Sequence, residues 1–265
     1  MSVPSEGRSG RRPDGRSVAD PAAPRGLRSL AVRDDEATEL MDDPAADPVT
    51  LANTYARFGL VNAFVSGHRA TYLRWIRPRL SPVWLTRVLD VGTGGADLPR
   101  RLLAWAAADG VRLEVVGIDP DARAIAFARE HQRRDPVPGL ELRPVATGDL
   151  VAQGERFAVV LSNHVLHHLD PHAFGAFLAD SERLVAPGGV AVHGDIERSR
   201  WGYAGFAAAT WPFQGTILRD SYIRPDGLTS IRRSFTAPEL AAVLPGDWRV
   251  RRAFPSRLEV TWSPT

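Results

Sequence analysis

The sequence predicts an α/β protein built on a doubly wound, mainly parallel seven-stranded sheet of the Rossmann-like type. Two patterns indicate this: the apolar segment Arg87–Val91 runs into a glycine-rich turn, and strand-like and helix-like segments then alternate as far as Gly194. The chain has 265 residues, of which 44% are hydrophobic, enough for one large α/β domain. Because strand, helix and strand follow one another, we expect right-handed crossovers between parallel strands.

The first part of the chain, residues 1–47, is predicted to be an unstructured tail. Residues 1–33 are rich in Gly, Pro, Ser and Arg and show no apolar periodicity, and residues 34–47 hold seven acidic side chains and no basic one. A basic arm that binds polyanions is the alternative. Met41 is the only other methionine, so translation starting there is a further hypothesis.

Residues 48–83 are predicted to form a helical cap on the main domain. Apolar residues recur at spacings of three and four from Pro48 and again from His68, and prolines close the second helix. Most aromatic side chains of the cap are expected to pack in its core. Three of its side chains are candidates for contact with a ligand: Tyr55, Asn62 and Arg74.

Residues 84–265 are predicted to form the main domain. Its expected strands are Arg87–Val91, Leu113–Ile118, Leu140–Ala146, Phe157–Leu161 and Val190–Gly194, with helices at Ala96–Ala108, Asp121–Arg133 and Pro171–Val185 between them. Because Pro144 cannot donate a ladder hydrogen bond, the third strand should lie at an edge. Residues 198–235 break the alternation and are predicted to be an insertion beside the substrate. Helix Ala237–Val243 and an antiparallel pair, Trp248–Phe254 and Arg257–Trp262, complete the chain.

The composition excludes several kinds of chemistry. The chain contains neither cysteine nor lysine, so disulfides, thiol catalysis, Schiff bases and a P-loop lysine are not expected. A formal charge of +2 does not favour nucleic acid as a partner. No apolar run reaches the roughly 18 residues needed to span a membrane, and no signal peptide is recognisable. We therefore expect a cytoplasmic protein; the oligomeric state stays open.

Polar and glycine residues follow four of the predicted strands, where ligands bind to open parallel sheets. They are Asp90, Gly92, Thr93 and Gly94 after the first strand, Asp119 and Pro120 after the second, Asp149 and Leu150 after the third, and Asn163 and His164 after the fourth. The glycines let a ligand approach the backbone, and a carboxylate ending the second strand is placed to hold a ribose. A nucleoside-containing cofactor is therefore predicted.

On these motifs, residues 84–196 resemble the class I S-adenosylmethionine-dependent methyltransferases. The resemblance implies that the turn around Gly92 and Gly94 cradles the methionine and ribose of S-adenosylmethionine, and that Asp119 accepts both ribose hydroxyls. It also implies that Asp149 takes the adenine amino group, with a backbone donor from Leu150, and that Asn163 lies near the methionine. The displaced third glycine of the turn favours this cofactor over a dinucleotide.

The candidate catalytic residues are His167, His193 and Asp195. Transfer to a hydroxyl oxygen needs a base or an ionised acceptor, and similar small-molecule O-methyltransferases use a histidine at the position of His167; here His168 replaces the acid that follows it. Alternation places His193 and Asp195 on one strand face, where Asp195 is suited to orient or ionise an acceptor. A metal held by His193, Asp195 and Glu197 is conceivable, but no metal is expected.

Two further segments, residues 47–55 and 226–235, resemble bacterial methyltransferases found beside type III polyketide synthases. This implies a small phenolic or polyketide-derived acceptor, methylated on oxygen or carbon, and the aromatic residues of the insertion suit an apolar pocket. The alternatives are a quinone or lipid C-methyltransferase and a non-catalytic subunit that binds the cofactor.

Overall fold

The computed structural model describes residues 30–264, apart from the side chains of residues 63–65. The prediction of disorder for residues 1–29 lies outside the described residues.

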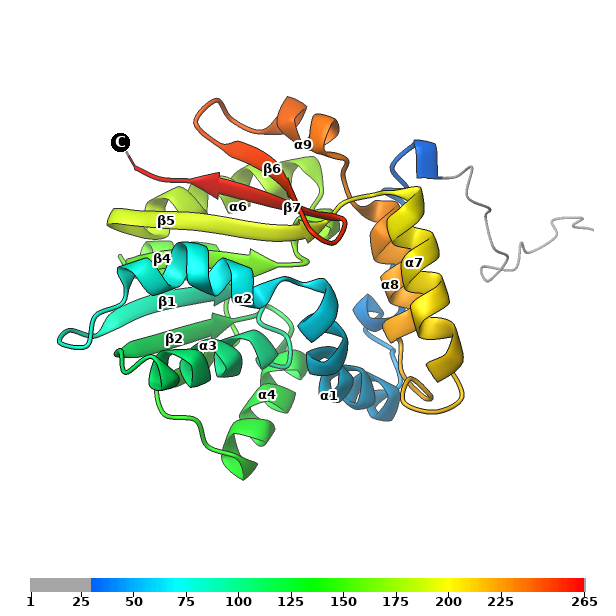
Figure 1. The fold of residues 1–265 in the computed structure, drawn as a ribbon, viewed down its shortest axis with the longest axis horizontal. Helices are drawn as coiled ribbons and strands as arrows, with labels where there is room; N and C mark the ends of the chain where they lie inside the picture. The colour runs from blue at the N-terminus through cyan, green and yellow to red at the C-terminus, as the bar shows by residue number, and fades with distance from the viewer. Residues whose placement is uncertain (1–29, 265) are drawn as a thin grey trace, which may run out of the picture.

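A seven-stranded sheet with the order β3-β2-β1-β4-β5-β7-β6 forms the centre of the molecule (Figure 1). The strands are β1 (Thr86–Val91), β2 (Leu113–Ile118), β3 (Leu140–Arg143), β4 (Phe157–Asn163), β5 (Val185–Ile196), β6 (Arg249–Ala253) and β7 (Arg257–Trp262). The first five are parallel, and β7 pairs antiparallel with both β5 and β6. The predicted fold class is confirmed.

Helices cover both faces of the sheet. They are α1 (Pro48–Val65), α2 (His68–Thr71), α3 (Asp97–Ala108), α4 (Ala122–Arg134), α5 (Thr147–Ala152), α6 (Pro171–Leu184), α7 (Arg200–Thr210), α8 (Ile223–Arg233) and α9 (Ala237–Val243). Short 3-10 or π turns are η2 (Leu40–Asp42), η3 (Tyr72–Ile76), η4 (Arg77–Arg79), η5 (Leu166–His168) and η6 (Trp211–Phe213). Over the residues described, no helix combines the length and the apolar character needed to cross a membrane.

The core has two main layers because the central strands are apolar on both sides. On one face α6 and α9 pack against Leu89, Val116 and Val160. On the other, α3 and η3 pack against Val88 and Val115. Near-continuous apolar runs of this kind are what buried parallel strands require. The carboxyl ends of the strands stay uncovered by these layers, which leaves that edge for a site.

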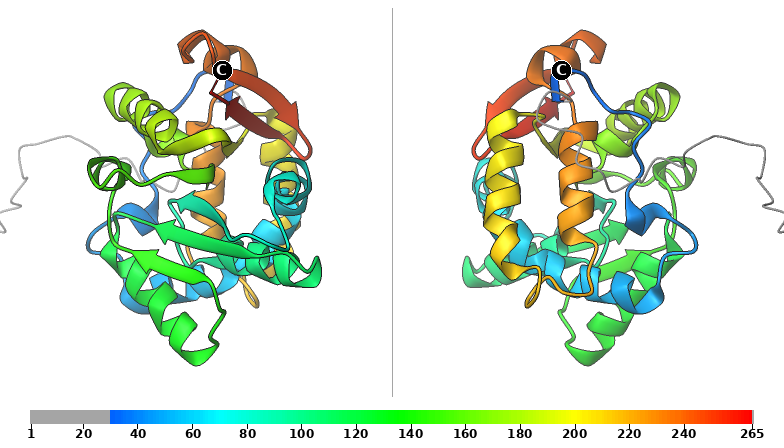
Figure 2. Two further views of the ribbon diagram at one scale, coloured as in Figure 1. Left: turned by 90° about the vertical axis from the view of Figure 1, so that its left-hand side faces the viewer. Right: turned by 90° about the vertical axis from the view of Figure 1, so that its right-hand side faces the viewer.

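Several boundaries differ from those predicted. Strand β3 ends at Arg143, so Pro144 follows the strand, although β3 does lie at the sheet edge as predicted. Strand β5 begins at Val185 rather than Val190, because residues around Gly188 continue it through an irregular register with β4. The insertion, for which no helix was predicted, forms α7 and α8. Figure 2 shows this pair side by side beyond the strand ends.

The prediction of an unstructured tail is wrong for residues 30–47. Leu30 is buried, and its carbonyl accepts a hydrogen bond from the Arg198 guanidinium at 3.1 Å. The backbone N–H groups of Leu40 and Met41 donate to the Asp226 carboxylate on α8, at 2.8 and 3.0 Å. The composition did not predict that this segment is ordered, because it is held by polar contacts with distant residues rather than by an apolar stripe of its own.

Candidate active site

A cavity of about 500 Å³ lies at the carboxyl ends of β1, β2 and β4. It is closed by residues of η2, α1, η5, α7 and α8, and the last two helices stand beyond the strand ends in Figure 1. Nine of the predicted site residues line it: Asp90, Gly92, Thr93, Gly94, Asp119, Pro120, Asn163, His164 and His167. Two of the cap candidates, Tyr55 and Asn62, also line it, whereas Arg74 is exposed and does not.

The glycine turn after β1 is fixed to the end of β2. The N–H groups of Gly92 and Thr93 both donate to the carbonyl of Ile118, at 2.9 and 3.0 Å. The φ angles of Gly92 and Gly94 are +70° and +53°, a region that favours glycine. No heavy atom lies within 4 Å of the place that a Cβ would take at Gly94. The turn therefore offers open space to a ligand along its backbone.

Asp119 connects this turn to β2. Its Oδ2 accepts the N–H of Gly94 at 3.0 Å, and its Oδ1 accepts the N–H of Asp121 at 2.9 Å. An ionised carboxylate has about four acceptor positions, so both oxygens keep capacity for hydroxyl donors from a ligand. This geometry suits the ribose role that the sequence implied.

The cavity wall is rich in carboxylates. Seven acidic residues line it, and no arginine does among the described residues. Asp90 is 2% exposed, and burial, with the nearby charges of Asp97 and Asp119, raises its pKa to about 8. Burial also raises the pKa of Asp119. Such a wall is suited to a ligand that carries positive charge, because each carboxylate ionises more readily beside a cation.

Asp149 and Leu150 do not line the cavity, and their predicted adenine contacts stay a prediction. The Asp149 carboxylate accepts the N–H of Ala146 at 2.9 Å and closes the first turn of α5, where the residue is exposed. Leu150 is fully buried in the core beside α6. In a Gly-Asp-Leu sequence at the start of a helix, the aspartate can cap the helix and the leucine can pack in the core. The motif alone does not distinguish these roles from cofactor binding.

His193 lies in the core, a position that does not fit its predicted catalytic role. It is 0% exposed, its ring lies 4.7 Å from that of Phe177 and 5.5 Å from that of Trp248, and its Nδ1 hydrogen-bonds Ser162 at 2.9 Å. Burial lowers the pKa of His193 to about 3, so the ring is neutral. As strand alternation predicted, His193 lies on the same face of β5 as Asp195. It is, however, two residues further from the carboxyl end of the strand.

Asp195 contacts His167 and does not line the cavity. The Asp195 Oδ1 lies 2.6 Å from the His167 Nδ1, and its Oδ2 accepts the His167 backbone N–H at 2.9 Å. Burial opposes a charge on His167, but Asp195 and the carboxylate of Glu39, 3.3 Å from Nε2, together raise its pKa to about 10. An imidazolium has no free lone pair. His167 can therefore act as the predicted general base only after another group has taken up its proton.

Two neutral histidines face the same cavity near Asn163. The Asn163 amide Nδ2 donates to the His68 Nε2 at 2.9 Å, and the His164 Nε2 lies 2.8 Å from the Ser66 hydroxyl. Burial lowers the pKa of His68 to about 3 and that of His164 to about 4. Asn163 thus has its amide oriented by a histidine that sequence analysis did not single out.

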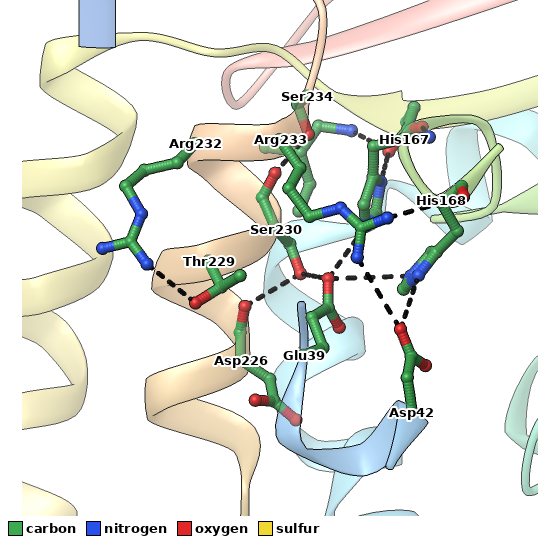
Figure 3. Close-up of polar contacts among 12 residues, drawn as sticks. Glu39, Asp42, His167, His168, Asp226, Thr229, Ser230, Arg232, Arg233 and Ser234 are labelled. Carbon is green, nitrogen blue, oxygen red and sulfur yellow. Dashed lines mark hydrogen bonds and ion pairs between the residues drawn. The ribbon is translucent and has the colours of Figure 1, made fainter. Parts of the chain in front are cut away.

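Four polar residues that line the cavity were missed by sequence analysis: Glu39, Asp42, Asp226 and Ser230. The Glu39 carboxylate accepts the Ser230 hydroxyl at 2.7 Å, and His168 lies 3.1 Å from Asp42 through Nδ1 (Figure 3). Burial raises the pKa of Asp226 to about 7. The dense acidic run of residues 34–47 was the available signal, but it was interpreted as a solvated tail.

The metal set considered from sequence is not assembled. His193 is in the core, Asp195 is bound to His167, and the Glu197 carboxylate accepts the Arg252 guanidinium at 2.6 Å. These three side chains do not converge on a common point in the cavity.

The proteins that this chain resembles are methyltransferases, in agreement with its fold and with the glycine turn after β1. Residues 88–189 match the family model described as a methyltransferase domain. A ubiquinone biosynthesis O-methyltransferase of Azorhizobium caulinodans is 30% identical over 217 residues, 78% of either chain. One of the same name from Rhizobium etli is 32% identical over 147 residues, 54% of this chain and only 56% of that protein.

Solved structures share the fold at low identity. The plantazolicin methyltransferase BpumL, in complex with SAH, superimposes with a TM-score of 0.55 and 11% identity, covering 89% of this chain and 96% of that one. A SAM-dependent methyltransferase from Aquifex aeolicus gives 0.51 and 15%, covering 81% and 97%.

The fold and the strand-end site define a nucleoside-cofactor enzyme of the Rossmann-like type. The chain belongs to the class I S-adenosylmethionine-dependent methyltransferases. S-adenosylmethionine is its cofactor, and the open glycine turn, Asp119 and the carboxylate-rich wall fit that cationic molecule.

Proposed function

We propose that the enzyme methylates a hydroxyl oxygen of a small aromatic acceptor, phenolic or quinol-like. The observation that carries this proposal is the make-up of the cavity beyond the glycine turn. Apolar side chains from several separate segments line it, next to the polar cluster at Glu39, His167 and His168. These apolar residues are Met41, Phe58, Val61, Val165, Leu169, Ile196, Phe206 and Ile223. The names of the relatives from Azorhizobium and Rhizobium support oxygen as the methylated atom.

The reaction balances as a single displacement. S-adenosylmethionine supplies a methyl group on a positively charged sulfur. The acceptor oxygen forms a bond to the methyl carbon while the carbon–sulfur bond breaks, the sulfur becomes a neutral thioether, and the hydroxyl proton leaves to solvent. The protein's contribution is to bind both molecules in line and to exclude water.

Phe206 is the side chain that we assign to the apolar acceptor wall. It packs across Gly227 of α8, where a Cβ would lie 2.4 Å from the Phe206 ring. Glycine at this position lets α7 bring an aromatic ring against α8 and into the cavity. An aromatic wall suits a flat acceptor ring.

The test combines an acceptor panel with two variants. Phenols, pyrones and quinols are incubated with the protein and S-adenosylmethionine, and the products are analysed for the gain of one methyl group and for its attachment to oxygen or carbon. We expect Phe206→Ala to raise the acceptor KM without changing cofactor affinity, whereas Phe213→Ala, on the partly exposed turn η6, leaves both unchanged. Methylation on carbon, or cofactor binding with no turnover on any acceptor, would contradict the proposal.

A further inference from the structure

The side chains of Glu39, His167 and His168 converge at the cavity wall. Their ligand atoms all lie within 4.8 Å of one another. The Glu39 Oε1 is 3.3 Å from the His167 Nε2 and 3.6 Å from the His168 Nε2. Figure 3 shows both rings pointing toward this carboxylate, with Glu39 coming from the N-terminal segment and the histidines from η5.

We infer that Glu39, His167 and His168 form a binding site for a divalent transition-metal ion such as Zn²⁺, Co²⁺ or Mn²⁺. Two imidazole nitrogens and one carboxylate oxygen are ligands that these ions accept, and three protein ligands leave a position for substrate or water. In a tetrahedral site with bonds of about 2.1 Å, ligand atoms are separated by about 3.4 Å. The two nitrogen-to-oxygen distances bracket that value.

The contacts on the opposite side of each ring carry the argument further. The His167 Nδ1 lies 2.6 Å from Asp195, and the His168 Nδ1 lies 3.1 Å from Asp42. Metal-binding histidines almost always present one nitrogen to the ion while the other donates to a carboxylate or carbonyl. Both histidines have this arrangement, and in both the nitrogen left over is the one that faces Glu39.

The surroundings of the His167 Nε2 agree with this arrangement. The ring is 1% exposed, and this atom has no hydrogen-bond partner of acceptable geometry, although it points into the cluster. The two rings lie 4.3 Å apart, centre to centre.

All three ligands line the cavity, so the open position of the ion faces the acceptor. A divalent ion lowers the pKa of a hydroxyl bound to it, which would remove the need for a histidine base. This consequence rests on the proposed function, but the binding of the ion does not.

The experiment measures metal binding in the full chain without acceptor or cofactor. Protein free of any tag is stripped with a chelator and titrated with Co²⁺, whose visible absorption reports nitrogen and oxygen coordination. We expect one site, and at least tenfold weaker binding in Glu39→Gln and in His168→Asn. Asp195→Asn should weaken it about ten- to hundredfold. His172→Asn, at an exposed histidine of α6, is the matched control and should bind as the wild type does.

A measurement on the wild type alone guards against variants that fail to fold. X-ray absorption of the Zn²⁺-loaded protein should show two imidazole ligands. No cobalt spectrum, or no imidazole around zinc, would overturn the inference, as would equal affinity in Glu39→Gln, His168→Asn and wild type. Because no acceptor is present, that outcome is independent of whether the enzyme methylates phenols.

Discussion

Asp119 is a residue whose two carboxylate oxygens serve two tasks. Its carboxylate accepts the N–H groups of Gly94 and Asp121, and so holds the glycine turn and the start of α4 in place. The same oxygens face the cavity that binds the cofactor. Removing its charge should therefore affect ligand binding more than folding, because the amide of asparagine still offers one acceptor.

We expect Asp119→Asn to weaken cofactor binding about ten- to hundredfold, since hydrogen bonds to a charged group contribute roughly 1.5–3 kcal/mol. Isothermal titration with S-adenosylmethionine measures the change. Asp170→Asn is a matched control, because Asp170 also accepts a backbone N–H, that of Ala173 at 2.8 Å, but lies outside the cavity. Unchanged affinity in Asp119→Asn would contradict the ribose role.

The raised pKa of Asp90 predicts that the affinity for the cofactor depends on pH. Its pKa of about 8 in the ligand-free site means that it is mostly protonated at pH 7. A bound cation favours the ionised carboxylate, so binding at pH 7 must release a proton, and affinity should rise with pH up to about 8 and then level off.

Titration calorimetry in buffers of different ionisation enthalpy measures this proton release directly. In Asp90→Asn the contribution of this group is absent, so proton release should fall and the affinity should vary less with pH. Equal proton release in the variant and the wild type would show that another group titrates.

At the scale of elements, the turn between β1 and α3 depends on glycine for two separable reasons. Gly92 has a φ of +70°, and a Cβ there would lie 2.5 Å from the Val165 Cγ2. Gly188, in β5, has a φ of +74° but no heavy atom within 4 Å of its Cβ position. Substitutions at Gly92 and Gly188 therefore separate the free-energy cost of a positive φ from the free-energy cost of a steric clash.

We expect Gly188→Ala to lower the free energy of unfolding by about 1–2 kcal/mol, the cost of a left-handed alanine. Gly92→Ala should lower it further and weaken cofactor binding. Adding Val165→Ala to Gly92→Ala should restore part of that stability. Urea unfolding of the four proteins measures each step, and equal losses at Gly92 and Gly188 would exclude the contact with Val165.

For the whole molecule, the cavity is closed by segments far apart in the sequence. Residues 39–42 bind α8 through Asp226 and bind η5 through Glu39 and Asp42. The site therefore forms only when the N-terminal segment, the strand ends and the insertion come together.

Hydrogen exchange provides a test of this closure. Addition of SAH should slow exchange of the amides of Leu40 and Met41, which are bonded to α8, and of Gly94 in the turn, because ligand in the cavity stabilises the closed state. Amides of β6, remote from the cavity, serve as the internal control. If η2 exchanges at the same rate with and without SAH, the segment does not take part in closure.

The predictions from sequence were most accurate where local pattern decides structure. Strand β1, its glycine turn and the position of Asp119 at the end of β2 were predicted correctly, because apolar runs and turn residues act over a few positions. The helix pair α7 and α8 was missed because aromatic and polar residues in it alternate without a clear period. The cofactor role of Asp149 stays a prediction, because its carboxylate caps α5 and does not line the cavity.

The sequence by itself determined the class of this protein, because consecutive parallel strands must present their carboxyl ends, and the residues that follow them, at one edge of the sheet. Only the tertiary structure decided which distant residues close the cavity. Glu39 meets His167 across more than a hundred residues, and His193 and Asp195, two positions apart, lie against core aromatic rings and against His167, respectively. Contacts of that kind depend on how distant elements pack, which no local pattern of residues encodes.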